Sequence, residues 1–293
     1  MQVGRYQILE TLGVGAYSKV VRGHDPLIDR SVAIKLFSPL LVRGEARHRF
    51  LREARVVGKL SHPSVITVHD MGIEESTQTP YMVMELVEGQ SLDKIIAKGS
   101  VAFPLACQWA GHLAEALAAA HRRAVIHGDI KPANILITNE NRVKLTDFGM
   151  ARLASHQTDA AVRGTPAYWC PEQILGRAQD ERSDLFSLGV VLHEMLTGIN
   201  PFAGDSIPTV CNQILSSTPL PPSRSNPSIP AVLDEIVGSC LVKEPQLRMS
   251  SADALADQLF PLARRNPAPA QPVAVGAPEP SLRSRAARLL RSA

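Results

Sequence analysis

Two short polar segments in the middle of the chain carry residues that could do chemistry. The first, HGDIKPANIL at residues 127–136, contains Asp129, Lys131 and Asn134, and the second, DFG, begins at Asp147. Taken alone, an aspartate, a lysine and an asparagine so close together usually mark only a polar loop. Three oxygen-bearing side chains in loops that flank a short predicted strand pair, however, suit a hard cation such as Mg²⁺ held against phosphates.

A second group of candidate residues lies nearer the N-terminus. The segment GVGAYSKV at residues 13–20 lies between two predicted strands, and alone it could equally be an ordinary hairpin turn. Lys35 follows in VAIK, and Glu53 lies in a predicted helix, on the face that carries Phe50 and Val57. Each charge alone would more often be a solvated surface group. A buried lysine and a buried carboxylate make each other tolerable, so we expect these two to pair.

The elements that must position these residues form a strand-rich part followed by a helical part. Strands are predicted at residues 6–13, 18–25, 30–37, 64–74 and 80–88. A helix is predicted over residues 45–60, because its apolar residues have helical spacing and Pro63 prevents continuation. Later helices are predicted near residues 105–123, 183–198 and 231–242, with a short strand pair over 134–146.

Composition indicates a globular protein and excludes several classes. The 293 residues are 45% hydrophobic and 20% charged, which allows a large core. No apolar run approaches the roughly 18 to 20 residues of a membrane span, and the first residues lack the shape of a signal peptide, so we expect a cytoplasmic protein. The four cysteines form no C-x-x-C pair, which argues against a zinc site and against a dense disulfide framework.

The net charge of +3 conceals an uneven distribution. From residue 263 onward the chain has six arginines and one glutamate, so residues 1–262 are slightly acidic and give no reason to expect nucleic-acid binding. Residues 266–280 form a Pro/Ala linker that cannot bury enough apolar surface to fold. The last segment, residues 281–293, is either a disordered solvated tail or a basic amphipathic helix that touches anionic membrane or precedes a membrane span.

The order of these motifs resembles that of the eukaryotic-like (Hanks-type) protein kinases, and most of all the bacterial serine/threonine kinases. The similarity runs from residue 6 to about residue 262. It implies an α+β, two-lobed protein kinase fold. Residues 1–87 would form a small β-rich N-lobe with one helix and residues 88–262 a larger, mainly helical C-lobe, while residues 263–293 would be a disordered tail. It also implies ATP and Mg²⁺ as cofactors and protein substrates with serine or threonine acceptors, while the oligomeric state stays open.

The resemblance also implies roles for individual residues. Asp129 would accept the proton of the substrate hydroxyl, and Lys131 would steady the transferred phosphoryl group. Asn134 and Asp147 would bind Mg²⁺ ions. Lys131 and Thr165, the latter in GTPAYWCPE, are typical of serine/threonine rather than tyrosine kinases.

The nucleotide would lie between the glycine-rich segment and the strands that follow it. Lys35 would hold the α- and β-phosphates and be oriented by Glu53. The segment that covers the phosphates would comprise Leu12, Gly13, Val14, Gly15, Ala16, Tyr17, Ser18, Lys19 and Val20. In the adenine pocket, Val20, Ala33 and Leu136 would sandwich the ring and Met84 would be the gatekeeper, while Glu85 and Val87 would contribute backbone groups. Core packing alone would explain the apolar members about as well.

Further positions match the family's structural residues or depart from its pattern. Glu172 is expected to pair with Arg248, and Asp184 to anchor the segment around Asp129. Gly128 stands where the family usually has an arginine that meets an activation-loop phosphate, which questions the usual switch without affecting the chemistry. Cys170 replaces an alanine, and either a redox role or a small apolar filler would account for it.

Three classes of function fit this resemblance. The leading one is an active serine/threonine protein kinase. A pseudokinase scaffold is the second, but degenerate members lose the lysine, the base or the metal ligands, which are all intact here. A small-molecule kinase is the third, and the complete segment 164–172, which forms a peptide-docking platform in protein kinases, argues against it.

Overall fold

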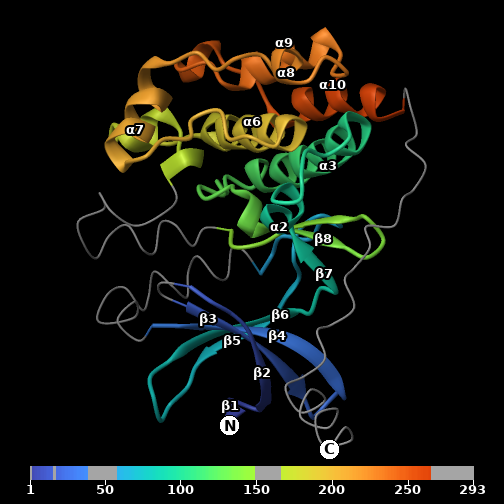
Figure 1. Ribbon diagram of the computed structural model, residues 1–293. Helices are drawn as coiled ribbons and strands as arrows, with labels where there is room; N and C mark the ends of the chain where they lie inside the picture. The colour runs from blue at the N-terminus through green and yellow to red at the C-terminus, as the bar shows by residue number, and fades with distance from the viewer. Residues whose placement is uncertain (1, 16–17, 39–57, 149–165, 265–293) are drawn as a thin grey trace, which may run out of the picture.

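The central N-terminal strands form because their apolar residues alternate between two faces that both become buried, whereas the strand at residues 6–14 is mostly exposed. A computed structural model of the chain describes residues 2–15, 18–38, 58–148 and 166–264 (Figure 1). Its larger sheet has six strands in the order β1-β2-β3-β4-β6-β5, and all neighbouring strands are antiparallel. The strands are β1 (Gln2–Val3), β2 (Tyr6–Val14), β3 (Ser18–Asp25), β4 (Arg30–Phe37), β5 (Val68–Ile73) and β6 (Pro80–Glu85).

The two faces of this sheet bury different residues. One face carries a cluster that includes Tyr6, Val21 and Ile34. The opposite face carries Ala33, which packs with Ile66 and Met84. Because side chains alternate along a strand, Lys35 lies on the same face of β4 as Ala33. The strand period therefore turns this lysine toward the other half of the molecule.

A second, smaller sheet lies between the large sheet and the helices (Figure 1). It consists of β7 (Gly89–Ser91), β8 (Ile135–Thr138) and β9 (Val143–Leu145), paired in that order. The turn between β8 and β9 contains Asn141 with φ 60°, a left-handed conformation that asparagine tolerates better than most residues. Leu145 also forms a parallel bridge with Val65, which ties this sheet to the segment that precedes β5.

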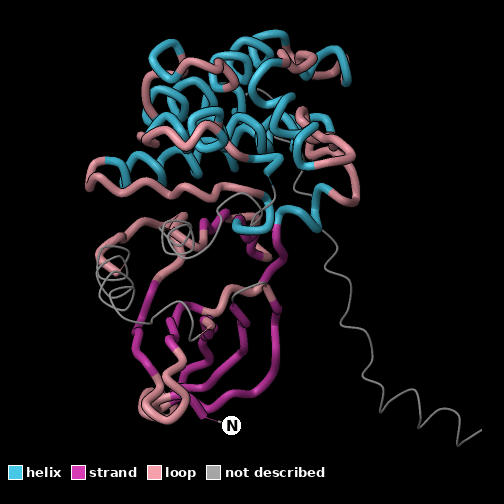
Figure 2. The backbone as a smooth tube through the Cα atoms, turned by 90° about the vertical axis from the view of Figure 1, so that its left-hand side faces the viewer, coloured by secondary structure: helices cyan, strands magenta, loops and turns pink. Residues whose placement is uncertain are grey.

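The helices gather at the other end of the molecule (Figure 2). They are α2 (Leu92–Ile96), α3 (Phe103–His121), α5 (Pro171–Ile174), α6 (Glu181–Thr197), α7 (Ile207–Ser216), α8 (Pro222–Ser225), α9 (Ala231–Cys240) and α10 (Ala252–Arg264). Short 3₁₀ turns occur at Pro132–Asn134, Pro166–Tyr168 and Pro245–Leu247.

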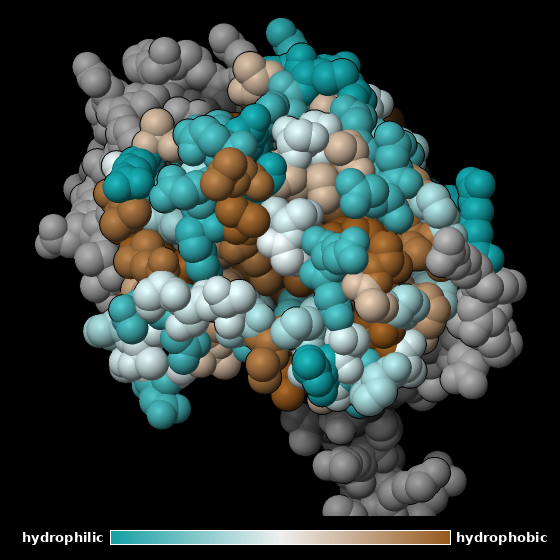
Figure 3. Space-filling model, turned by 90° about the horizontal axis from the view of Figure 1, so that it is seen from above, coloured by the Kyte–Doolittle hydropathy of each residue, from teal (hydrophilic) through white to brown (hydrophobic). Residues whose placement is uncertain are grey.

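The helical core is built around α3 and α6. Small residues let neighbouring helices approach closely: a side chain at Gly111 would meet the ring of Phe260 at 2.8 Å, and one at Gly189 would meet Cys240 at 2.5 Å. The start of α6 is fixed by a capping box in which Asp180 and Ser183 satisfy each other's backbone N–H groups. Seen from this end, the surface mixes hydrophobic and hydrophilic residues, as expected for helices that bury only one side (Figure 3).

Most predicted elements agree with the structure, and the differences are informative. The strands predicted at 18–25 and 30–37 have the observed bounds, whereas the one predicted at 64–74 shortens to β5, with Val65 in an isolated bridge. Helix α10 was not predicted. Residues 45–57 of the helix predicted over 45–60 lie outside the described residues, as does the tail from residue 265. No helix in the described ranges has the length and hydrophobicity to cross a membrane.

A buried ion pair joins two distant parts of the helical region. Arg248 donates to both carboxylate oxygens of Glu172, at 2.8 and 3.1 Å, and both side chains are almost fully buried. Ser183 donates a further hydrogen bond to Glu172 at 2.6 Å. Burial alone would raise the pKa of Glu172, but the arginine and the hydroxyl outweigh it and hold the pKa below its ordinary value. The predicted pairing of Glu172 with Arg248 is thus confirmed.

We expect Glu172→Gln to lower the free energy of unfolding by roughly 3–5 kcal/mol, because it leaves the Arg248 guanidinium buried without a counter-charge. Chemical denaturation at pH 7 measures this. Since the folded-state pKa of Glu172 is depressed, its stabilisation exists above the ordinary value of 4.5 and fades as the pH falls below it. The variant should therefore approach the wild type in acid. A matched control is Asp253→Asn, whose exposed pair with Arg122 should contribute less than about 1 kcal/mol. Equal losses in the two variants would contradict the account.

Candidate active site

Apolar residues from both parts of the molecule pack together on the face of the large sheet that carries Ala33 and Lys35. Ala33 and Met84 are cross-strand partners in β4 and β6, so their side chains share this face. They form one cluster with the residues Val20, Ile66, Leu86, Val87 and Leu136. The five apolar residues predicted for the adenine pocket, including Val20, are therefore together, although they come from separate elements.

Lys35 and Asp147 form an ion pair across the two parts of the molecule. Lys35 lies in β4 and is 8% exposed, and its Nζ is 2.7 Å from Oδ2 of Asp147. The sequence predicted that a buried lysine here needs a carboxylate, and the structure provides Asp147. Glu53, the partner proposed from the sequence, lies outside the described residues. An ammonium and a carboxylate at this distance form a site suited to an anion and a cation together.

The segment from Asp129 to Asn134 is held by its own side chains. Lys131 Nζ is 2.7 Å from Asp129 Oδ2, and Asn134 Nδ2 donates to the same oxygen at 2.9 Å and to the backbone carbonyl of Asp129 at 2.8 Å. Pro132 begins a 3₁₀ turn that brings Asn134 back toward Asp129. The carboxylate of Asp129 is thus fixed in place while its side chain remains 28% exposed.

Asp184, near the start of α6, anchors this segment to the helical part of the molecule. Its carboxylate accepts backbone N–H groups from His127 and Gly128, both at 2.9 Å, and lies 2.8 Å from the ring of His121. The side chain is 1% exposed, so these contacts compensate for the burial of its charge. The predicted anchoring role of Asp184 is confirmed.

His127 links the segment around Asp129 to the residues before Asp147. Its Nδ1 accepts the backbone N–H of Asp129 at 3.2 Å, so the other nitrogen, Nε2, is the one that donates to the carbonyl of Thr146 at 2.8 Å. The ring also packs against Phe148, with 4.5 Å between ring centroids. A fully buried histidine therefore connects the two candidate loops through hydrogen bonds to the backbone of both.

Two residues of the site have left-handed backbone conformations. Gly128 has φ 75°, which glycine adopts without a steric penalty. Asp147 has φ 67°, which costs a residue with a side chain on the order of 1 kcal/mol. Strained residues of this kind persist where the surroundings hold them, and they concentrate at functional sites.

The remaining predicted positions are distributed along the β2–β3 ribbon. Gly13 and Val14 pair with Val20 and Lys19, and the N–H of Gly15 donates to the carbonyl of Ser18 at 2.7 Å. Leu12 is about half exposed, at 49%. Ala16, Tyr17 and Thr165 lie outside the described residues, as does Glu53.

Some residues of the site were not identified from the sequence. Ile66 and Leu86 belong to the adenine-side cluster, but an apolar residue in an apolar run carries no distinguishing signal.

Cys170, with 1% exposure, has its thiol pKa raised to about 12, chiefly by burial. A thiol so rarely ionised is a poor nucleophile, which favours the apolar filler over the redox role.

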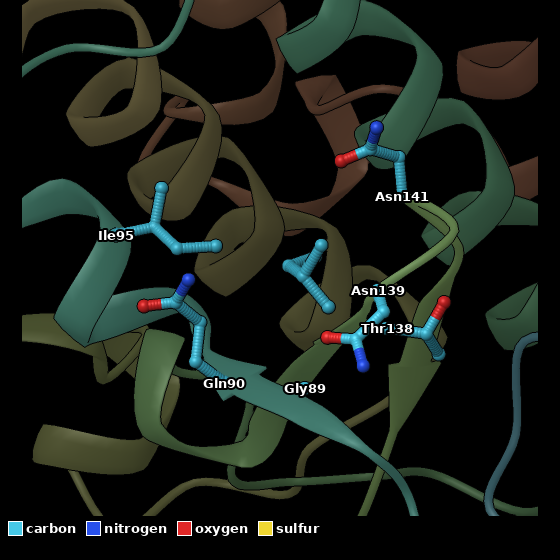
Figure 4. Close-up of a pocket in the computed structure, with 7 residues that line it drawn as sticks. Gly89, Gln90, Ile95, Thr138, Asn139 and Asn141 are labelled. Atoms are coloured by element: carbon cyan, nitrogen blue, oxygen red, sulfur yellow. The ribbon is translucent and has the colours of Figure 1, made fainter. Parts of the chain in front are cut away.

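A separate small pocket lies between α2 and the β7–β8 pair (Figure 4). Its lining is formed by Gly89, Gln90, Ile95, Ile137, Thr138, Asn139 and Asn141. No ionisable side chain is among them, and none was predicted to bind nucleotide. We therefore assign the candidate site to the Lys35–Asp147 region and not to this pocket.

Comparison with known proteins decides the family. Residues 6–260 match the family described as the protein kinase domain. This chain belongs to the protein kinase family. The expected two-lobed α+β fold, with its curled antiparallel sheet and helical lobe, is confirmed.

Several relatives that the chain matches are bacterial kinases. It is 38% identical over 260 residues to a probable serine/threonine-protein kinase of Clostridium perfringens, covering 87% of this chain and 38% of the relative. It is 39% identical over 264 residues to the serine/threonine-protein kinase PknB of Mycobacterium leprae, covering 87% and 42%. For PknB of Mycobacterium tuberculosis the values are 38% over 292 residues, covering 97% and 47%. The chain thus spans less than half the length of these relatives, and the expected likeness to bacterial kinases is confirmed.

We expect Asp184→Asn to loosen the segment around Asp129, because the amide would present a donor to the N–H groups of His127 and Gly128. Hydrogen exchange at these two amides should accelerate by at least about tenfold, which mass spectrometry of the peptide containing them detects. Asp180→Asn is the control, since this residue caps the same helix but contacts Arg182 instead. Equal exchange in the two variants would show that Asp184 is not the anchor.

Proposed function

We propose that this chain transfers the γ-phosphoryl group of ATP, with Mg²⁺, to serine or threonine hydroxyls of proteins. The observation that carries the proposal is the ion pair of Lys35 with Asp147, together with the hydrogen bond from Asn134 to Asp129, within one kinase fold. The names of the bacterial relatives support the serine/threonine preference. Because the chain spans less than half the length of these relatives, its activity on protein substrates is part of this proposal.

The donor set fits a magnesium ion. Asp147 offers a carboxylate, and Asn134 offers its amide oxygen, because the nitrogen of that amide is occupied with Asp129. Within the described residues no three His, Cys, Asp or Glu side chains form a metal cluster. One carboxylate and one amide suit Mg²⁺, which keeps waters and takes phosphate oxygens as its other ligands. When bound, the ion neutralises the charge that develops on the phosphate oxygens.

The chain's own residues would supply positioning and proton transfer. Lys35 holds the α- and β-phosphates once these phosphates compete with Asp147 for its ammonium group. Asp129 orients the acceptor hydroxyl and accepts its proton, and Lys131, 2.7 Å from that carboxylate, stabilises the transferred group. Phosphoryl transfer needs little covalent work from the protein, so fixed charges in the right places can provide most of the catalysis.

Lys35→Met and Asp147→Asn should each reduce phosphoryl transfer by at least about a hundredfold while leaving the fold intact, because each removes a transition-state interaction and little core volume. The assay uses labelled ATP, Mg²⁺ and a generic basic protein, followed by phosphoamino-acid analysis. We expect phosphoserine and phosphothreonine as the products. Phosphotyrosine as the main product, or more than about a tenth of wild-type turnover in either variant, would refute the assignment.

We also propose that the kinase is active without phosphorylation of its activation loop. The support is Gly128, which stands where relatives commonly have an arginine that meets the loop phosphate, and whose φ of 75° suits glycine. Asp159 precedes AAV, where bacterial relatives commonly have a phosphorylated threonine, and would supply a permanent negative charge opposite Arg152. Both of these loop residues lie outside the described residues.

Phosphate-free protein should therefore be active from the first moments of the reaction. Initial rates on a peptide, measured after phosphatase treatment and removal of the phosphatase, should change by less than roughly threefold, and Thr158→Ala should behave likewise. Asp159→Ala should cost more, on the scale of about 1 kcal/mol for a partly exposed ion pair. A lag that ATP preincubation removes, with a tenfold or greater loss in Thr158→Ala, would show that the usual switch operates.

A further inference from the structure

A partly buried ion pair connects the end of β6 to the strand that leads to Asp147. Glu85 is the last residue of β6, and Lys144 lies in β9. Lys144 Nζ is 2.7 Å from Glu85 Oε1, and the two side chains are only 17% and 21% exposed. The same Glu85 oxygen accepts the backbone N–H of Thr67 at 2.7 Å. One carboxylate oxygen thus has two donors from two different segments.

The carboxylate of Glu85 closes a triangle of three segments. The segment before β5 is bonded to β9 through the N–H of Ile66 and the carbonyl of Leu145, at 3.0 Å. It is bonded to the end of β6 through the N–H of Glu85 and the carbonyl of Thr67, at 2.9 Å. The third side, between β6 and β9, is closed by the ion pair with Lys144. We call Glu85, Thr67 and Lys144 the hinge clamp.

The electrostatics indicate a strong contact in this position. Burial alone would raise the pKa of Glu85, but the Lys144 ammonium and the Thr67 N–H outweigh it, and the pKa lies below its ordinary value. The carboxylate is therefore charged at neutral pH. Because the pair is mostly out of solvent, salt screens it less than an exposed pair.

Both ends of the hinge clamp adjoin the candidate site. Lys144 is the cross-strand partner of Leu136 in the adenine-side cluster and lies three residues before Asp147. Glu85 follows Met84 of the same cluster. We propose that the hinge clamp is a positioning device, which fixes β9, and with it Asp147, relative to the backbone that takes the adenine. This inference rests on the proposed function, since it concerns how that site is aligned.

The clamp accompanies an aligned site. In the same structure Lys35 contacts Asp147, and Asp129, Lys131 and Asn134 are joined in their network. The clamp is therefore formed in the same arrangement as the contacts proposed for chemistry. The rate of phosphoryl transfer depends steeply on the position of the reacting groups. A contact of modest strength can therefore change the rate strongly when it fixes that position.

Lys144→Met keeps most of the side chain's bulk but removes its charge. We expect the KM for ATP to rise and kcat to fall, each by about threefold to tenfold, at temperatures well below melting. Lys144→Arg restores a cation and should remain within about twofold of the wild type in both constants. Glu85→Gln combined with Lys144→Met should be no worse than Lys144→Met alone, since the two residues act as one unit.

The control is Arg122→Met, which removes a cation from an exposed pair with Asp253 and should change neither constant. A purely structural role would lower the melting temperature of Lys144→Met and leave both constants within twofold, which would overturn the inference. An increase in kcat would also overturn it, since the clamp would then restrain the site. Calorimetric affinity for a non-hydrolysable ATP analogue gives an independent readout, and it should weaken by a similar factor.

The proposed function can fail separately from this inference. A wild-type chain that binds the analogue but transfers no phosphate would contradict the proposed function. In that case, equal analogue affinities for the wild type and Lys144→Met would contradict the hinge clamp as well, whereas a loss confined to Lys144→Met would support it.

Discussion

Two opposite charges must meet between the two halves of this molecule. Lys35 comes from the large sheet and Asp147 from the loop after β9, and their charged atoms are 2.7 Å apart. With its side chain only 10% exposed, the lysine gains a counter-charge from this partner, which offsets part of the cost of burying an ammonium group. In the function that we propose, the nucleotide phosphates would bind Lys35 and the magnesium ion would bind Asp147, so the two charges would no longer contact each other directly.

The rest of the helical part keeps this meeting point in register. Asp184 accepts hydrogen bonds from the backbone of His127 and Gly128. The ring of His127 in turn is hydrogen-bonded to the carbonyl of Thr146, the residue before Asp147. Deeper in the helical lobe, Arg248 and Glu172 fasten the start of α5 to the segment before α10. Each connection uses a buried polar group whose partners are all on the protein. Such networks are costly when broken, so they specify one arrangement of the loops.

Local rules on sequence account for the strands and for most of the site. Alternation in VAIK places Ala33 and Lys35 on one face, and the need of a buried lysine for a carboxylate could be stated from the sequence. This rule alone could not identify the partner, because Glu53 and Asp147 both satisfy it. Among the described residues Lys35 pairs with Asp147, and Glu53 lies outside them. The resemblance to kinases, in contrast, correctly predicted that Glu172 pairs with Arg248 and that Asp184 anchors the segment around Asp129.

Other features depend on tertiary contacts that leave no local signal. Helix α10 is only partly of this kind, because its amphipathic pattern is a local signal. Pro261 within it predicts a stop, and packing against α3 accompanies its continuation past that residue. The adenine role proposed for Glu85 concerned its backbone, and its side-chain contact with Lys144 joins residues 59 positions apart. Neither residue has an unusual type for its strand. Only the arrangement of three segments around one oxygen gives them a common purpose.

We propose that Asp147 holds a magnesium ion beside phosphates that Lys35 contacts. Calorimetric titration of the wild type and Asp147→Asn with a non-hydrolysable ATP analogue, with and without Mg²⁺, tests it most directly. The account predicts that Mg²⁺ strengthens binding to the wild type by at least about tenfold, a change of about 1.4 kcal/mol, and that this gain largely disappears in Asp147→Asn. The same gain from Mg²⁺ in both proteins would contradict it.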